Sequence, residues 1–160
     1  MKLEPVEPLS DTEQADLVAA LDDEYMARAT YAQVIADFGA VRPFVNIVEA
    51  EGRHAEALVS LFHGYGVPVP PDTWPGRVAR YASIREACEA GVVAEVENGD
   101  LYDRLLAGTE RADILAVYRD LQAASQERHL QAFRRCAERG GDAAGDGHGQ
   151  RFRRRRRGQS

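Results

Sequence analysis

The sequence predicts an all-α protein that folds as a four-helix bundle. Alanine, leucine, glutamate and arginine dominate its 160 residues, and these residue types favour helix. Apolar residues recur at helical spacing in four separate segments, as they do along the buried face of a helix. Prolines gather in the connection between the second and third of these segments, where they exclude helix.

Residues typical of helix ends set the bounds of the first two segments. Ser10 and Glu13 can satisfy each other's exposed amides in a capping box, so the first helix is expected to begin there. Gly39 can end it. The second helix is expected to begin near Pro43, a good first-turn residue, and to end at Gly64. The short connection between the two predicts an antiparallel hairpin.

The last two segments form a second predicted hairpin. A second capping box, formed by Ser83 and Glu86, is expected to open the third helix. A turn at Gly108 and Thr109 leads to the fourth, which is expected to run as one helix to Cys136.

The connection between the hairpins is rich in proline from Gly66 to Gly76, which makes it long and stiff. Roughly 15 residues in extended polyproline form span about 45 Å, whereas a 25-residue helix is about 38 Å long. The third helix can therefore run parallel to the second, in an up-down-down-up order. Trp74 is expected to anchor this crossover to the bundle.

Charge and composition divide the chain into three parts. Residues 1–9 are an N-terminal extension, residues 10–138 form the bundle, and residues 139–160 are a tail of glycine, aspartate and arginine that is expected to be disordered. The tail carries seven arginines and two aspartates, although the whole chain has a formal net charge of -6. Such a basic tail could hold nucleic acid phosphates, contact the acidic body of a neighbouring copy, or have no role.

The sequence carries no signal for export or for a membrane. Its N-terminus lacks an apolar core of the secretory type, and no apolar run approaches the roughly 20 residues of a membrane span. We therefore expect a cytoplasmic protein without a membrane partner. In that compartment Cys88 and Cys136 are expected to be a buried, reduced pair.

A polar signature appears twice, about seventy residues apart. In the first copy Glu24 precedes Tyr31 by seven residues, and in the second Glu95 precedes Tyr102 by seven. Each copy then ends in histidine, within Glu51-Gly52-Arg53-His54 in the first and Gln126-Glu127-Arg128-His129 in the second. These polar residues lie on the apolar stripes and near the middle of each helix, so they should meet at one height in the bundle.

Such a buried polar layer is costly unless something compensates for it. An isolated buried carboxylate costs several kcal/mol or takes up a proton, and several carboxylates together repel one another. Divalent metal ions remove both problems because they neutralise charge and accept lone pairs. Glutamates from two helices and Glu-x-x-His turns from the other two form the di-metal carboxylate site of four-helix bundles. The aspartates and glutamates at positions 22, 23, 49 and 97 are expected on the solvated face instead.

The chain resembles the ferritin-like superfamily, and most closely a bacterial branch catalogued as a domain of unknown function. The resemblance covers roughly residues 10 to 138 and rests on Leu21-Asp22-Asp23-Glu24-Tyr25, Phe38-Gly39, Pro43-Phe44, Ile47, Glu51, His54, Tyr65-Gly66, Glu95, Leu101-Tyr102-Asp103 and His129-Leu130. It implies a carboxylate-bridged pair of iron or manganese ions held by Glu24, Glu51, His54, Glu95 and His129. It also implies oxidation of ferrous iron or reduction of peroxide or oxygen. Assembly into a homo-oligomer is common in the superfamily, but nothing in this sequence specifies an oligomeric state.

One position departs from the superfamily pattern, which expects glutamate three residues before the last histidine. This chain has Gln126 there, at most a weak ligand or a hydrogen-bond partner of a ligand. Three glutamates leave two divalent ions with one uncompensated charge, so two metals, one metal and none all remain open. The alternative is a metal-free structural or binding module whose polar layer fixes register and whose basic tail contacts nucleic acid. Tyr31 and Tyr102 are hydrogen-bond donors beside the site, radical sites, or core residues with a satisfied hydroxyl.

Overall fold

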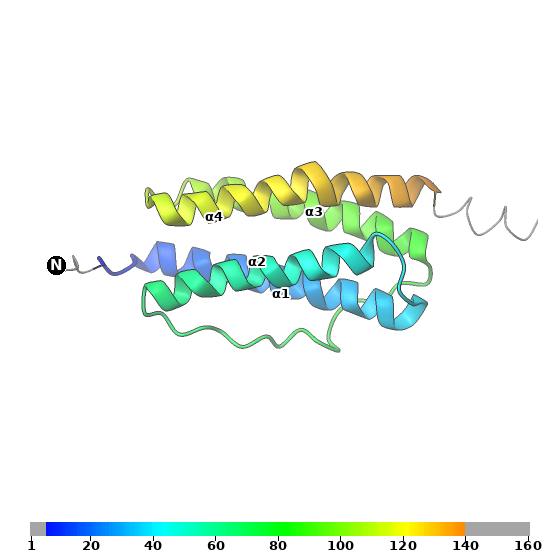
Figure 1. The fold of residues 1–160 in the computed structure, drawn as a ribbon, viewed down its shortest axis with the longest axis horizontal. Helices are drawn as coiled ribbons and strands as arrows, with labels where there is room; N and C mark the ends of the chain where they lie inside the picture. The colour runs from blue at the N-terminus through cyan, green and yellow to red at the C-terminus, as the bar shows by residue number, and fades with distance from the viewer. Residues whose placement is uncertain (1–5, 140–160) are drawn as a thin grey trace, which may run out of the picture.

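A computed structural model describes residues 6–139, which are helical apart from their connections (Figure 1). The helices are α1 (Asp11–Phe38), α2 (Phe44–Gly64), α3 (Ile84–Leu106) and α4 (Ala112–Ala123), followed by a π-helix, η1 (Ala124–His129). Helical turns continue over residues 130–139, and no strand occurs between residues 6 and 139. The predicted all-α class and helical bundle are thus confirmed, but the fourth helix is interrupted by η1 where one continuous helix was expected.

The N-terminal caps of α1 and α3 agree with the sequence to different degrees. At α1, Ser10 and Glu13 form the complete capping box. At α3, the Ser83 hydroxyl accepts the backbone N–H of Glu86 at 3.1 Å, but the Glu86 carboxylate accepts from the N–H of Ala82. The second capping box therefore has the bond to the Ser83 hydroxyl, but its Glu86 carboxylate binds the N–H of Ala82 instead of that of Ser83.

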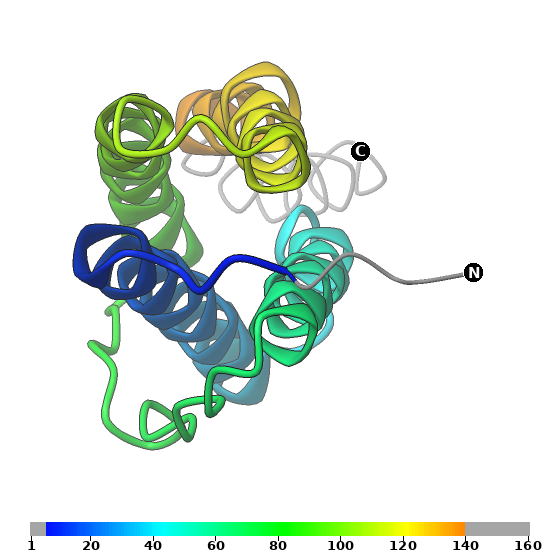
Figure 2. The same ribbon diagram turned by 90° about the vertical axis from the view of Figure 1, so that its left-hand side faces the viewer.

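The helices pack as two hairpins, α1 with α2 and α3 with α4 (Figure 1). Residues 65–83 leave the end of α2 and run along the outside of the bundle to the start of α3 at the opposite end. An end-on view places the four helices at the corners of a quadrilateral, with this connection outside α1 and α2 (Figure 2).

Three polar contacts hold the connection against α1. The Trp74 indole N–H donates to Asp22 Oδ1 at 2.9 Å, which confirms the expected anchoring role of this tryptophan. Arg28 pairs with Asp72 at 3.0 Å, and Arg80 pairs with Asp37 at 2.6 Å. The connection is thus fixed on both sides of Trp74.

The core consists of two apolar clusters with a polar layer between them. One cluster gathers around Leu17, Leu58 and Tyr118, and the other gathers around Phe44 and Phe133. Along α1, Leu17, Leu21 and Tyr25 belong to the first cluster, and Tyr31 and Val34 belong to the second. The apolar clusters supply most of the stability of such a bundle, because burial of apolar surface is the dominant favourable contribution to folding. They also seal the polar layer from above and below.

Cys88 and Cys136 form a disulfide, so the expectation of a reduced pair is wrong. The bond joins α3 to residues 130–139 across a Cα–Cα distance of 5.9 Å, which is within the normal range for disulfides. Sequence spacing could not show that the two cysteines face each other. Disulfides are rare in cytosolic proteins, so this bond gives no support to the cytoplasmic location, which stays a prediction.

None of the described helices is long and apolar enough to cross a membrane. The predictions for residues 1–5 and for the basic tail from residue 140 lie outside the described part of the chain.

Candidate metal centre

Five side chains from all sides of the bundle converge in the polar layer. Glu24 comes from α1, Glu51 and His54 from α2, Glu95 from α3, and His129 from the last position of η1. The three glutamates expose 2–3 % of their surface, and His129 exposes 5 %. The structure therefore brings together all five residues that the sequence singled out as ligands.

The five residues form two groups that share Glu51. In the first group, His54 Nδ1 lies 3.5 Å from Glu24 Oε2 and 3.4 Å from Glu51 Oε2. In the second, His129 Nδ1 lies 3.2 Å from Glu51 Oε1 and 3.5 Å from Glu95 Oε1. Within each group the possible ligand atoms lie within 4.8 Å of one another. Glu51 thus turns one oxygen toward each histidine, while Glu95 belongs to one group only.

Two buried tyrosines cross-link the glutamates of α1 and α3. The Tyr31 hydroxyl donates to Glu95 Oε1 at 3.0 Å, and the Tyr102 hydroxyl donates to Glu24 Oε1 at 2.7 Å. Each tyrosine lies seven residues after one glutamate and bonds to the glutamate of the other helix. Both tyrosines are therefore core residues with a satisfied hydroxyl, and both act as hydrogen-bond donors beside the site. Burial, together with the nearby carboxylates, raises the pKa of both hydroxyls well above the usual value, so they stay protonated and donate.

The π-helix gives Glu95 its remaining partners. Ser125 lies on η1 and donates its hydroxyl to Glu95 Oε2. Gln126 donates its amide to the backbone carbonyl of Glu95 at 2.8 Å, so it faces α3 rather than the cluster of ligand atoms. A Cβ atom at position 99 would collide with this amide, so the Gln126 side chain occupies space that Gly99 leaves free. The sequence did not reveal the π-helix, although such helices occur often at functional sites.

The electrostatics of the layer are those of carboxylates and imidazoles forced together. Burial, reinforced by the charge of Glu51, raises the pKa of Glu24 to about 8. Burial alone would lower the pKa of both histidines, but the neighbouring carboxylates outweigh it and raise the pKa of His54 and of His129 to about 9. The metal-free layer therefore holds protons at neutral pH.

Two atoms of the layer are buried without a hydrogen-bond partner among the described residues: Glu51 Oε2 and His129 Nδ1. His129 Nδ1 is close to Glu51 Oε1, but the pair does not have the geometry of a hydrogen bond. Unpaired buried polar atoms are rare, because each costs about 1–3 kcal/mol. Oxygen and imidazole donors around one space suit iron and manganese. The residues present thus fit the metal ions that the sequence pattern implies.

Asp23 corrects another expectation, since it does not lie on the solvated face. Its carboxylate accepts a hydrogen bond from the side-chain amide of Asn98 on α3. Burial raises the pKa of Asp23 to about 6. Helical periodicity placed Asp23 on the solvated face, because it does not show that Asn98 of α3 packs against this position.

Comparison with known proteins gives a fold but no function. No family model matches the chain. A protein of Methanocaldococcus jannaschii, named only as uncharacterized protein MJ0754, is 26% identical over 144 residues, which cover 81% of this chain and 77% of the relative. The crystal structure of hypothetical protein MJ0754 aligns with a TM-score of 0.76 at 24% identity, over 88% of this chain and 87% of that one.

A second solved structure has a similar fold. The conserved hypothetical protein rv2844 of Mycobacterium tuberculosis aligns with a TM-score of 0.69 at 16% identity, over 79% of this chain and 91% of that one. At this identity the likeness concerns the fold alone. The helical bundle thus occurs in proteins of an archaeon and a bacterium.

Proposed function

We propose that this chain is a ferritin-like metal-binding protein that holds one or two iron or manganese ions through Glu24, Glu51, His54, Glu95 and His129. The observation that carries the proposal is the arrangement around Glu51, whose two oxygens face different histidines. One of these oxygens and one histidine nitrogen are buried without a partner. A bound metal ion would give both atoms a partner.

The course of the chain supports a ferritin-like order of helices. Residues 65–83 cross the length of the bundle between α2 and α3, as an up-down-down-up order requires (Figure 1). Two hairpins related by this crossover would place corresponding glutamates, Glu24 and Glu95, on facing helices. The reciprocal bonds from Tyr31 and Tyr102 follow the same internal repeat.

Each residue of the site has a definite part in this proposal. Glu51 is the shared ligand, and Glu24 and Glu95 each complete one group. Tyr31 and Tyr102 orient these two glutamates, which leaves the second oxygen of Glu24 to face His54. The apolar clusters flank the layer on both sides. Bound iron or manganese would supply one-electron chemistry, which suits oxidation of ferrous iron or the handling of oxygen or peroxide.

Metal content and oxygen reactivity test the proposal. Purified protein is expected to contain iron or manganese above background by elemental analysis. Addition of ferrous iron in the presence of oxygen is expected to produce a near-ultraviolet absorption band. Protein without metal, whose melting temperature does not change with iron or manganese, would contradict the proposal.

A second candidate is a metal-free binding or structural module, and the Gln126 amide on the backbone of α3 favours it because it leaves the layer one carboxylate short. If the protein is such a metal-free module, the double variant Glu51→Gln and His54→Ala would leave its function intact. The basic tail, which lies outside the described residues, would contact nucleic acid. Removal of residues 150–160 would then abolish a salt-sensitive retention on DNA, whereas unchanged retention would exclude this role of the tail.

A further inference from the structure

A cavity of about 210 Å³ lies between α1 and α3, under the connection from α2. Its wall on α3 is made by small side chains, Ala87, Ala90 and Ala94. Their spacing of three and four residues places them on one face of the helix, opposite α1. Larger residues at these positions would fill the space, so the gap between the two helices follows directly from the sequence of α3.

The inner end of the cavity reaches the candidate metal centre. Glu51, Glu95 and Tyr31 all contribute to its lining. Glu51 is 2 % exposed, and its Oε2 atom has no hydrogen-bond partner among the described residues. A mostly apolar space that ends at the carboxylates of Glu51 and Glu95 has the composition of a small-molecule site, where a few polar groups fix the orientation of the ligand.

The outer side of the cavity is covered by residues 74–81. This segment is held at one end by the bond from Trp74 to Asp22 and near the other by the ion pair of Arg80 with Asp37. Val78, between these contacts, lines the cavity. The cover is therefore fixed at two points on α1, and it lies over part of the cavity, which stays partly open to the surface.

We propose that this cavity binds a small, neutral organic molecule that is mostly apolar and carries one hydroxyl-type group, which it presents to Glu51. An apolar cavity of about 150 Å³ accommodates benzene, so this one accommodates a slightly larger molecule. The lining includes the carboxylates of Asp23, Glu51 and Glu95, and Arg77 is its one cationic side chain among the described residues. Such a lining disfavours organic anions. Such a neutral molecule would be a substrate of the proposed metal centre, a role that rests on the proposed function. Its binding to the cavity requires no metal.

Trp74 allows a direct test, because it is the chain's one tryptophan and it lines the cavity. Cyclohexanol is a suitable probe, since it is neutral, carries one hydroxyl and does not absorb where tryptophan emits. Titration with cyclohexanol is expected to change the emission of Trp74 in a saturable manner. Cyclohexanecarboxylate, an anion of similar shape, is expected to bind at least tenfold more weakly. No saturable change, or equal binding of the two probes, would overturn the proposal.

Variants of the cavity wall locate the binding. Ala90→Leu is expected to weaken cyclohexanol binding at least tenfold because its side chain fills the space. Val93→Leu is the matched control, since Val93 is 57 % exposed on the same helix and should leave binding unchanged. Should Ala90→Leu fail to fold, as judged by circular dichroism, Ala27→Leu fills the cavity from α1. Unchanged binding in the folded cavity variant would overturn the proposal.

A second measurement requires no variant. Met26 lines the cavity and is one of two methionines in the chain. In protein with ¹³C-labelled methionine methyl groups, cyclohexanol is expected to give a nuclear Overhauser effect to the Met26 methyl. Absence of this effect at saturating probe would contradict the assigned location.

Both titrations are carried out on metal-free and on manganese-loaded protein, which separates this inference from the proposed function. Cyclohexanol binding in a protein that takes up no manganese would support the cavity as a ligand site and refute the metal centre. Manganese uptake without cyclohexanol binding would overturn the cavity as a ligand site and leave the metal centre standing.

Discussion

At the scale of single residues, the site depends on how each oxygen of a glutamate is occupied. Tyr102 donates to one oxygen of Glu24, and Tyr31 donates to one oxygen of Glu95. Glu51 has no such donor on Oε2 and is the residue common to both groups. Hydrogen bonds that orient ligand side chains are typical of metal sites, so this arrangement agrees with the proposed centre.

Tyr102→Phe is expected to weaken metal binding about 10- to 100-fold, because partners that orient ligands have effects of this size. The loss arises from Glu24, whose Oε1 atom would then be buried without its donor. Isothermal titration with manganese measures it. Tyr118→Phe is the control. Tyr118 is buried in the same apolar cluster as Tyr102 and packs against its ring, but among the described residues it makes no hydrogen bond to the candidate ligands. Equal affinities in the two variants would show that Tyr102 does not support a ligand.

Gln126→Glu is expected not to add a fourth carboxylate to the polar layer. The Gln126 amide donates to the Glu95 carbonyl, and a carboxylate cannot donate there. Because the carbonyl would lose its partner and face a charge, the variant should lose about 1–3 kcal/mol of stability. Thermal unfolding and metal content per chain are the measurements. A gain of one metal ion per chain would show that position 126 can turn toward the site after all.

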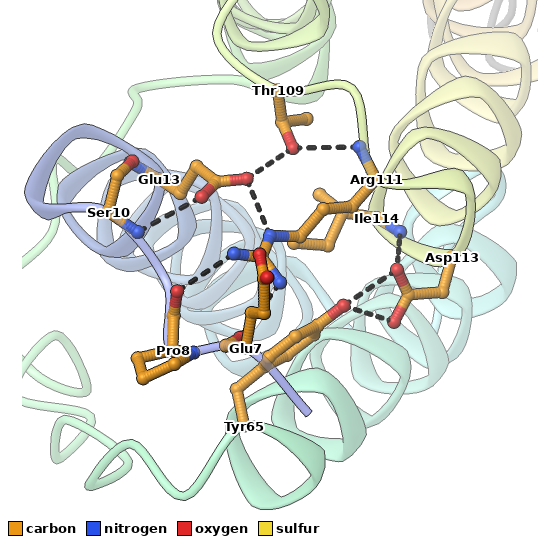
Figure 3. Close-up of polar contacts among 9 residues, drawn as sticks. All are labelled: Glu7, Pro8, Ser10, Glu13, Tyr65, Thr109, Arg111, Asp113 and Ile114. Carbon is orange, nitrogen blue, oxygen red and sulfur yellow. Dashed lines mark hydrogen bonds and ion pairs between the residues drawn. The ribbon is translucent and has the colours of Figure 1, made fainter. Parts of the chain in front are cut away.

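At the scale of elements, contacts between the helices fix how far each helix is shifted along its neighbours, and this brings the polar residues to one height. The start of α1 is joined to the start of α4 by Glu13, which accepts from Arg111 at 2.8 Å and from Thr109 at 2.6 Å (Figure 3). The side chain of Arg111 also donates to the backbone carbonyls of Glu7 and Pro8. This cluster fixes the end of the bundle at which the chain enters.

Glu13→Gln tests this cluster through its pH dependence. The bond from Arg111 is the main reason why the pKa of Glu13 falls from its usual 4.5 to about 2. A lowered pKa in the folded state contributes stability above the unfolded value, and that contribution is lost as pH falls through the folded value. The wild type should therefore melt higher than Glu13→Gln at pH 7, and the gap should close between pH 4.5 and pH 2. The exposed residue Glu56 provides the control, Glu56→Gln, for which little change is expected.

Two glycines in helices are expected to respond in opposite ways to alanine. A Cβ atom at Gly91 would lie 2.7 Å from the ring of Phe133, so Gly91→Ala should cost about 1–3 kcal/mol through overpacking of α3. At Gly52 on α2 nothing lies within 4 Å, so Gly52→Ala should gain about 0.5–1 kcal/mol. Chemical denaturation of both variants measures the free energy of unfolding. Equal effects would contradict the close approach of residues 130–139 to α3.

At the scale of the whole molecule, the helices and the convergence of the five candidate ligands could be predicted, because helical periodicity fixes which residues share a face and a height. What could not be predicted depends on contacts between distant segments. The facing of Cys88 and Cys136, the burial of Asp23 by Asn98, and the insertion of η1 are of this kind. The π-helix decides where Ser125 and Gln126 point, and no local signal in the sequence marks it.

The most direct test of the central claim is an anaerobic titration of manganese or ferrous iron into the wild type, Glu51→Gln and Glu24→Gln. Because Glu51 belongs to both groups and Glu24 to one, Glu51→Gln should abolish all binding, whereas Glu24→Gln should retain part of it. Wild-type affinity should also rise from pH 6 to pH 8, since protons on the histidines and on Glu24, whose pKa is about 8, compete with metal. Wild-type protein that binds no metal, or Glu51→Gln protein that binds it as well as the wild type does, would contradict the account.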